Sequence, residues 1–190
     1  MTVLGAILTG GMSTRMGQDK ADVLVGERTM LELVGDAVRS VSDHTVLLGP
    51  DRDGWECWPD SVHAQGPLAG IATALSRTTR PHVLLMAVDQ PFARSETLQG
   101  IVGLADDIPV VPVDDHGVPQ VTCALYPRSI AQEAADEAAS SGSVQSLLDR
   151  VSFRPVPRGE WEKWGEDGRS WYSADDVASL DRGLAQFQLP

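Results

Sequence analysis

Two kinds of hydrophobic pattern take turns along the chain, and together they predict alternating strands and helices. Short continuous apolar runs are typical of buried strands in a parallel sheet. They predict strands over residues 3–8, 44–48, 82–88, 108–113, 121–126 and 151–156. Helical spacing, alanine content and capping residues predict helices over residues 30–41, 68–75, 95–104 and 129–139, and from Ser173 to about Phe187. Because strand and helix alternate through the first half of the chain, we expect βαβ units, with a parallel sheet covered by helices.

Two stretches show no regular period, and we interpret them as loops. Residues 50–66 are irregular and rich in Asp, Pro and Trp. Residues 158–172 hold three tryptophans among charges and glycines, and a surface loop is the favoured interpretation, with a lid or a contact surface as the alternative. No repeat or Pro/Ser-rich linker divides the chain. We therefore expect one domain over residues 1–190, a three-layer α/β/α sandwich with a mostly parallel, Rossmann-like sheet.

Composition and charge exclude several classes of function. Hydrophobic residues make up 42% of the chain, which indicates a globular protein with a large core. The net charge of −12 argues against nucleic acid and against an anionic membrane as partners. The N-terminal apolar run lacks a basic flank and is too short to span a bilayer, and Cys57 and Cys123 form no metal or redox pattern. The simplest interpretation is a cytoplasmic protein with buried or idle thiols.

Residues 7–20 predict a receptor for a polyphosphate. An apolar run ends in Gly10-Gly11, and a loop of small residues then leads to Arg15 and Lys20. Glycines let backbone N–H groups approach an anion, and the two cations suit phosphate oxygens. The loop matches neither G-x-x-x-x-G-K-[ST] nor G-x-G-x-x-G. A tight turn after a strand would also need the two glycines, but it would not explain Arg15 and Lys20.

Asp89 is a candidate ligand for Mg²⁺. It follows the strand predicted over residues 82–88 and precedes Gln90-Pro91. In open α/β sheets, ligands lie outside the carboxyl ends of the strands. A carboxylate there can hold Mg²⁺ that bridges triphosphate oxygens, whereas an Asp at a strand end also serves as a helix cap or turn former. The residues alone leave these two interpretations open.

Three other positions lie near predicted strand or helix ends. The run from Gly66 to Gly70, Gly-Pro-Leu-Ala-Gly, forms a turn into a helix N-terminus, which suits an anion or the edge of a base. A packing glycine at a strand–helix joint explains the same residues. Asp60 is by itself a solvated loop acid, and Gly49 ends the second predicted strand. These last two gain a functional interpretation only through a family resemblance.

The loop after the first strand resembles a long family signature. Residues 8–20, Leu-Thr-Gly-Gly-Met-Ser-Thr-Arg-Met-Gly-Gln-Asp-Lys, are similar to the L-x-G-G-x-S-x-R-M-G-x-x-K signature of MobA-like nucleotidyltransferases. Further stretches follow in the order and at the spacing of that family, namely Pro59-Asp60, Gly66 to Ile71, Val88 to Pro91 and, as a weaker match, Pro119-Gln120 with Ala124 to Tyr126. The resemblance covers roughly residues 3–150.

The resemblance implies a fold of the nucleotide-diphospho-sugar transferase type and the activity of a molybdenum cofactor guanylyltransferase. In that reaction the phosphate of molybdenum-bound molybdopterin attacks the α-phosphate of GTP, and pyrophosphate leaves. The resemblance further implies Mg²⁺ as the cofactor, GTP and molybdopterin as substrates, and contact with other cofactor-assembly proteins or molybdoenzymes.

The resemblance also implies roles for individual residues. The nucleotide-binding positions of the family correspond here to Leu8, Thr9, Gly10, Gly11, Lys20, Gly49, Asp60, Gly66, Pro67, Leu68 and Asp89. Its catalytic positions correspond to Arg15, Lys20 and Asp89, with the two cations neutralising phosphate charge and the carboxylate holding Mg²⁺. Gly49 stands where the family often has Asn, so only its backbone can make that contact.

One departure from the family keeps other functions open. The family's Asn-x-Asn-Thr-Pro-like segment is replaced here by residues 171–176, Trp-Tyr-Ser-Ala-Asp-Asp. One alternative is therefore a nucleotide-binding protein without catalysis that acts as a partner in cofactor assembly. Another is a nucleotidyltransferase that uses CTP on molybdopterin or on a sugar or alditol phosphate, although Gly10-Gly11 favours guanine.

Overall fold

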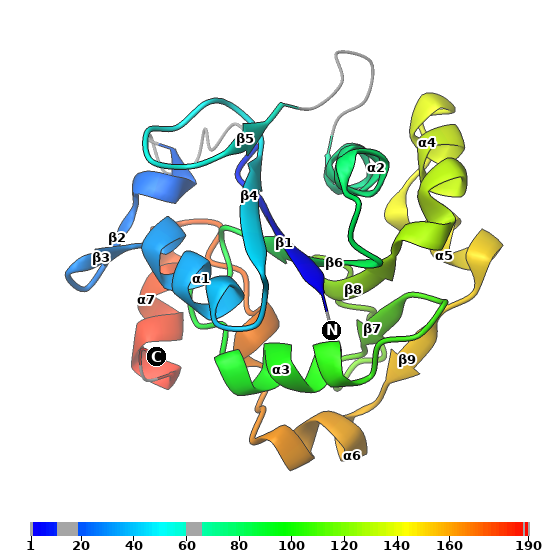
Figure 1. The fold of residues 1–190 in the computed structure, drawn as a ribbon. Coiled ribbons are helices and arrows are strands. Elements are labelled where there is room, and N and C mark those ends of the chain that lie inside the picture. Colours follow the sequence, from blue (N-terminus) through cyan, green and yellow to red (C-terminus); the bar gives the residue numbers. More distant parts are fainter. Residues whose placement is uncertain (1, 11–18, 60–65, 188, 190) are drawn as a thin grey trace.

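A sheet of seven strands runs through the middle of the structure, with helices on both of its faces (Figure 1). The computed structural model describes residues 2–10, 19–59, 66–187 and 189. The strand order is β5-β4-β1-β6-β8-β7-β9. These strands are β1 (Val3–Leu8), β4 (His44–Leu48), β5 (Cys57–Trp58), β6 (His82–Ala87), β7 (Val110–Pro112), β8 (Cys123–Pro127) and β9 (Arg154–Val156). A second, antiparallel sheet consists of β2 (Leu24–Val25) and β3 (Arg28–Thr29).

The central strands are parallel and end at one edge of the sheet. The register places Leu8, the last residue of β1, opposite Leu48 of β4 and Ala87 of β6. β5 is parallel to β4 and β9 to β7, whereas β8 is antiparallel to both of its neighbours. The mostly parallel, Rossmann-like sheet expected from the sequence is therefore confirmed. The carboxyl ends of β1, β4 and β6 are therefore aligned. In open α/β sheets, ligands bind just outside such aligned strand ends.

Helices cover both faces of the sheet and complete the expected three layers. They are α1 (Met30–Arg39), α2 (Pro67–Arg77), α3 (Ser95–Gly103), α4 (Ala131–Ala139), α5 (Val144–Val151), α6 (Arg158–Trp161) and α7 (Val177–Gln186). Figure 1 shows α1 and α3 on one side of the sheet and α2, α4 and α5 on the other. Successive residues of a strand point to opposite faces. Accordingly, Val3 and Ile7 of β1 enter the core with α1 and α3, and Leu4 and Ala6 enter the core with α2 and α4.

Three short elements differ from the expected pattern. Residues 151–156 do not form one strand, because Val151 ends α5 and β9 begins only at Arg154. The sequence pattern does not predict α5, although Ser143 caps it by accepting a hydrogen bond from the Ser146 backbone N–H at 3.0 Å. The two-residue strand β5 lies inside the stretch interpreted as irregular, and two residues are too few to show a period.

Two helix caps also differ from expectation. Ser95 is the first residue of α3, which begins after Arg94 without a side-chain cap. Asp176, rather than Ser173, caps α7, because its carboxylate accepts a hydrogen bond from the Ser179 backbone N–H at 2.7 Å. No helix in the described ranges is both long enough and apolar enough to cross a membrane.

The tryptophan-rich segment over residues 158–172 is part of the core, so its interpretation as a surface loop is wrong. The segment forms α6 and two 3₁₀ turns, Glu162–Trp164 and Arg169–Trp171. Trp161 and Trp171 are only 2% and 8% exposed. The Trp161 indole N–H donates to the Val113 carbonyl at 3.0 Å, which ties the segment to the end of β7.

The buried carboxylate of Glu166 fixes the same segment from inside. It accepts hydrogen bonds from the hydroxyls of Thr97 and Ser170 and, at 2.7 Å, from the Gly168 backbone N–H. Arg94 adds a hydrogen bond from its guanidinium to the Gly165 carbonyl at 2.6 Å. Buried polar side chains are stable only when they are hydrogen-bonded in this way. The chain therefore enters residues 173–176 from a fixed position beside α3.

Candidate active site

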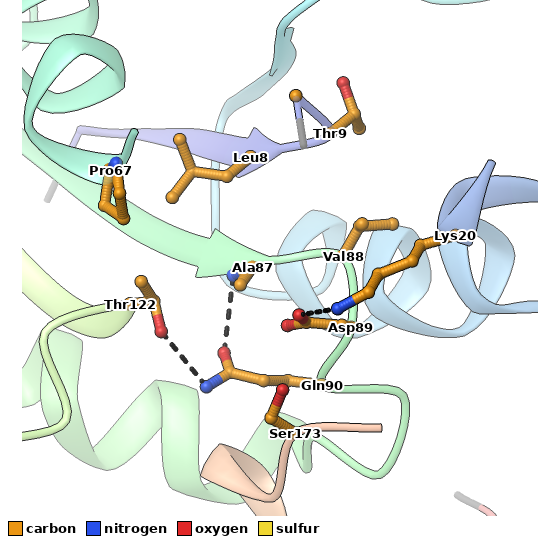
Figure 2. Close-up of a pocket in the computed structure, with 11 residues that line it drawn as sticks. Leu8, Thr9, Lys20, Pro67, Ala87, Val88, Asp89, Gln90, Thr122 and Ser173 are labelled. Carbon is orange, nitrogen blue, oxygen red and sulfur yellow. Dashed lines mark hydrogen bonds and ion pairs between the residues drawn. The ribbon is translucent and has the colours of Figure 1, made fainter. Parts of the chain in front are cut away.

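A cavity of about 320 Å³ lies at the carboxyl ends of β1 and β6 (Figure 2). Its walls come from the turns after both strands, the start of α2, the loop before β8 and the segment before α7. It is lined by Leu8, Thr9, Gly10, Lys20, Pro67, Ala87, Val88, Asp89, Gln90, Thr122 and Ser173. This is the position that a doubly wound sheet offers to a ligand.

The turn after β1 is held by hydrogen bonds to its neighbours. The Thr9 backbone N–H donates to the Leu48 carbonyl at 3.0 Å, and the Thr9 hydroxyl donates to the same oxygen at 3.3 Å. The Val88 N–H donates to the Leu8 carbonyl at 3.0 Å. These bonds bring Gly10 to the surface of the cavity with its backbone available to a ligand.

Gly49 shapes this turn through its lack of a side chain. Its backbone φ is +148°, a conformation that residues with a side chain rarely adopt. A Cβ there would lie 2.6 Å from the Thr9 hydroxyl and 2.9 Å from the Gly10 backbone nitrogen. The Asn that the family often carries at this position therefore does not fit this backbone.

We expect Gly49→Ala to lower the free energy of unfolding by about 1–3 kcal/mol, because it adds backbone strain and a contact that is too close. Gly54→Ala is the matched control, since Gly54 also has a positive φ (+80°) but nothing within 4 Å of the added Cβ. Urea unfolding of both variants measures the difference. An unfolding midpoint of the Gly49 variant equal to that of the Gly54 variant would contradict this account.

Lys20 enters the cavity from the 3₁₀ turn Lys20–Asp22. Asp19 caps this turn by accepting a hydrogen bond from the Ala21 N–H at 2.9 Å. Arg52 clamps the turn from the loop before β5 through ion pairs with Asp19, at 2.7 Å, and with Asp22. The base of the Lys20 side chain is therefore fixed, while its ammonium group extends into the cavity.

The Lys20 ammonium bridges two carboxylates. Its Nζ lies 2.7 Å from Asp89 Oδ2 and 2.7 Å from Asp175 Oδ1. Burial by itself lowers the pKa of Lys20, but the hydrogen bonds and charges of Asp175 and Asp89 outweigh it, and the pKa is raised. Lys20 therefore carries its full positive charge throughout the neutral pH range.

The backbone around Asp89 links the end of β6 to the segment before α7. The Asp89 carbonyl accepts a hydrogen bond from the Ala174 N–H at 2.8 Å. The buried Gln90 side chain accepts from the Ala87 N–H at 3.3 Å and donates to the Thr122 hydroxyl at 3.2 Å (Figure 2). Asp89 caps none of the described helices, and its carboxylate faces the Lys20 ammonium.

The structure brings together part of the predicted set of site residues. Leu8, Thr9, Gly10, Lys20, Pro67 and Asp89 all line the cavity. Gly66 and Leu68 do not line it: Gly66 is the N-cap of α2, with a φ of +82°, and Leu68 packs into the core at 4% exposure. Gly11, Arg15 and Asp60 lie outside the described residues.

The sequence reasoning missed several residues of the site. Gln90, Thr122 and Ser173 line the cavity, and Asp175 contacts Lys20. Gln90 follows Asp89 directly, and Asp175 lies in the segment that replaces the family's asparagines, so these two carried a signal. Nothing in the sequence pattern marks Thr122.

A second cavity of about 630 Å³ adjoins the first, and Ser173 lines both. It lies between α7, residues 161–176 and the loop that joins β7 to β8. Its walls combine aromatic rings, such as Trp171 and Tyr172, with carboxylates, such as Asp175. A ligand there would reach the Lys20 end of the first cavity.

Asp89 and Asp175 are the two carboxylates placed to hold a metal ion. Among the residues that the structure describes, no three or more His, Cys, Asp or Glu side chains form a metal cluster. Mg²⁺ is usually bound through one or two carboxylates together with substrate phosphates and water. The two carboxylates already share one cation, the Lys20 ammonium, so their chemistry fits a divalent cation completed by other oxygen ligands.

Solved structures share this fold. Molybdopterin-guanine dinucleotide biosynthesis protein A from Archaeoglobus fulgidus matches with a TM-score of 0.83 and 22% identity, covering 96% of this chain and 97% of that chain. A Mycobacterium tuberculosis protein whose structure is a complex with manganese has a TM-score of 0.70 and 20% identity, covering 97% and 99%. At these identities the likeness shows the fold alone.

Curated relatives give a closer match in sequence. A probable molybdenum cofactor guanylyltransferase of Halalkalibacterium halodurans is 30% identical over 165 residues, which are 80% of this chain and 78% of that protein. One of Deinococcus radiodurans is 33% identical over 99 residues, so the chain spans about half (51%) of that relative's length. The sequence profile of the MobA-like NTP transferase domain matches residues 5–155. Because this match covers well over half of the sequence, the chain belongs to the MobA-like NTP transferase family.

Proposed function

We propose that this protein is a Mg²⁺-dependent guanylyltransferase that transfers GMP from GTP to the phosphate of molybdenum-bound molybdopterin and releases pyrophosphate. The observation that carries the proposal is the pairing of Lys20 with Asp89 beside the Gly10 turn, at the carboxyl edge of the sheet. Family membership and the names of the relatives support the nucleotidyl transfer and the molybdenum cofactor.

The nucleophile in this reaction belongs to the substrate. An oxygen of the molybdopterin phosphate bonds to the α-phosphorus of GTP, and the bond from that phosphorus to the bridging oxygen of the β-phosphate breaks. The protein therefore contributes positioning and neutralisation of charge rather than a covalent intermediate. Molybdopterin would lie in the second cavity, which opens onto the same end of the first.

The proposed site residues have the following tasks in this scheme. Backbone groups of residues 8–11 hold the phosphates, the start of α2 at Gly66 and Pro67 faces the nucleotide, and Asp60 and the Gly49 backbone hold the nucleoside. Lys20 and Arg15 neutralise the triphosphate and the leaving pyrophosphate. Asp89 holds Mg²⁺, which when bound offsets the charge that develops on the phosphate oxygens. The finished cofactor is then passed on through transient contact with another assembly protein or a molybdoenzyme.

Binding of GTP with Mg²⁺ should raise the melting temperature more than CTP, ATP or UTP does. At a concentration 100 times its Kd, a ligand of the folded state adds about 2.7 kcal/mol, which is a shift of several degrees for a chain of this size. A thermal-shift assay with the four nucleotides measures the preference. A larger shift with CTP would favour the cytidylyl alternative, and no shift with any nucleotide would refute the nucleotide site.

Release of pyrophosphate separates the enzyme from a binding protein without catalysis. We expect pyrophosphate only when GTP, Mg²⁺ and molybdopterin are all present. A protein that shows the GTP-dependent thermal shift but releases no pyrophosphate under these conditions would be a nucleotide-binding partner instead.

A further inference from the structure

The ammonium of Lys20 lies between Asp89 and Asp175, the two carboxylates that would hold a metal ion. We propose that Lys20 is an exchangeable counter-ion: in the nucleotide-free protein its ammonium neutralises these two carboxylates, and it moves to the phosphates when a metal–triphosphate complex binds. A divalent cation then replaces it between the carboxylates. This inference rests on the proposed function, because it concerns the order of events at the same site.

A backbone hydrogen bond joins the two segments that carry these carboxylates. The Ala174 N–H donates to the carbonyl of Asp89 itself at 2.8 Å, so the residue before Asp175 is bonded to the residue that carries the other carboxylate. On the other side, Asp176 is fixed as the cap of α7. Asp175 is thus held between two anchored residues. Two carboxylates that contact the same ammonium would repel one another if that cation were removed and not replaced.

The cation between them is supplied by a flexible side chain. Among the described residues that line the first cavity, Lys20 is the only one with a positive charge. The side chains of Lys20 and Asp89 are 18% and 20% exposed, whereas that of Asp175 is 56% exposed. The cluster of Lys20, Asp89 and Asp175 is therefore most open to solvent on the Asp175 side. The four-carbon side chain of Lys20 is flexible, so its ammonium can change position. The backbone of Lys20 can stay in place meanwhile, because Asp19 and Arg52 hold the turn.

This arrangement couples the binding of a metal ion to the binding of a nucleotide. A divalent cation alone has to displace the ammonium without offering it another partner. A triphosphate brings oxygens that accept the ammonium and so frees the carboxylates. Metal should accordingly bind weakly to the nucleotide-free protein and tightly in the presence of a triphosphate.

A titration with Mn²⁺ in the absence of nucleotide tests this exchange, with free Mn²⁺ followed by electron paramagnetic resonance. We expect Lys20→Met to bind Mn²⁺ about tenfold more tightly than the wild type, the size expected when one positive charge is removed beside a largely buried carboxylate. Lys20→Met with Asp175→Asn should lose that gain. Lys163→Met, which removes the other lysine of the chain from an exposed position, should change nothing. Unchanged Mn²⁺ affinity in Lys20→Met, or a gain that persists in the double variant, would overturn the proposal.

A second measurement keeps the test independent of how well the lysine variant folds. In metal-free buffer, Asp175→Asn should bind pyrophosphate several-fold more tightly than the wild type, because the ammonium loses one of its two partners. Asp107→Asn is the control matched in charge, because Asp107 is exposed, lies between α3 and β7 and lines neither cavity. Equal pyrophosphate affinities of the two variants would contradict the proposed role of Asp175 as a partner of the Lys20 ammonium.

These outcomes are separate from those of the proposed function. The Mn²⁺ titration uses neither GTP nor molybdopterin, so the exchange can hold in a protein that transfers no guanylyl group. Conversely, guanylyl transfer with unchanged Mn²⁺ affinity in Lys20→Met would leave the function in place and remove the exchange.

Discussion

Asp89→Asn is expected to abolish Mg²⁺-dependent guanylyl transfer, with turnover falling by at least about 10³-fold. The Asn side chain keeps the size of the Asp but loses the charge that would hold the metal. The backbone carbonyl of residue 89, which accepts the hydrogen bond from Ala174, is unchanged. The fold should therefore survive while catalysis does not.

The measurement is steady-state release of pyrophosphate at increasing concentrations of Mg²⁺, with circular dichroism to check the fold. Asp107→Asn serves as the control, since Asp107 is an exposed residue between α3 and β7. Its activity should match that of the wild type. Activity in Asp89→Asn that still rises with Mg²⁺ would remove Asp89 from its proposed role.

Lys20→Ala is expected to lower turnover by about 10²-fold or more, the usual cost of losing one key electrostatic group at a reacting centre. The raised pKa of Lys20 means that the wild type keeps this charge at every pH at which the assay is run. The loss should therefore be the same across the neutral range. Lys163→Ala is the matched control because the chain has only these two lysines, and we expect it to retain full activity.

Metal affinity and turnover should move in opposite directions in Lys20 variants. The exchange predicts that removing the ammonium strengthens Mn²⁺ binding to the empty site, while the proposed mechanism predicts that it slows transfer. A structural collapse of the site would lower both quantities. Measuring the two on one preparation of Lys20→Ala therefore distinguishes a specific effect from a loss of fold, and unchanged turnover would show that Lys20 does not act on the triphosphate.

The sequence by itself determined strands β1, β4 and β6 of the sheet and about half of the residues that line the first cavity. Strands buried on both faces are continuous apolar runs, and this local signal predicts β1, β4 and β6 with their correct ends or within one residue. Parallel neighbours end at one edge, so the turn after β1 and Asp89 after β6 had to meet there. Lys20 lines the same cavity.

Only the tertiary structure decided the burial of residues 158–172 and the contact between Lys20 and Asp175. Trp161 and Glu166 lie in a stretch whose composition resembles a surface loop, and their burial depends on Val113 and Thr97, which are far away in the sequence. Asp175 is 155 positions from Lys20, and neither residue's neighbours predict the contact. Local patterns record which side of an element is buried, whereas an ion pair across the cavity depends on how separate elements pack, and that information is spread over the whole chain.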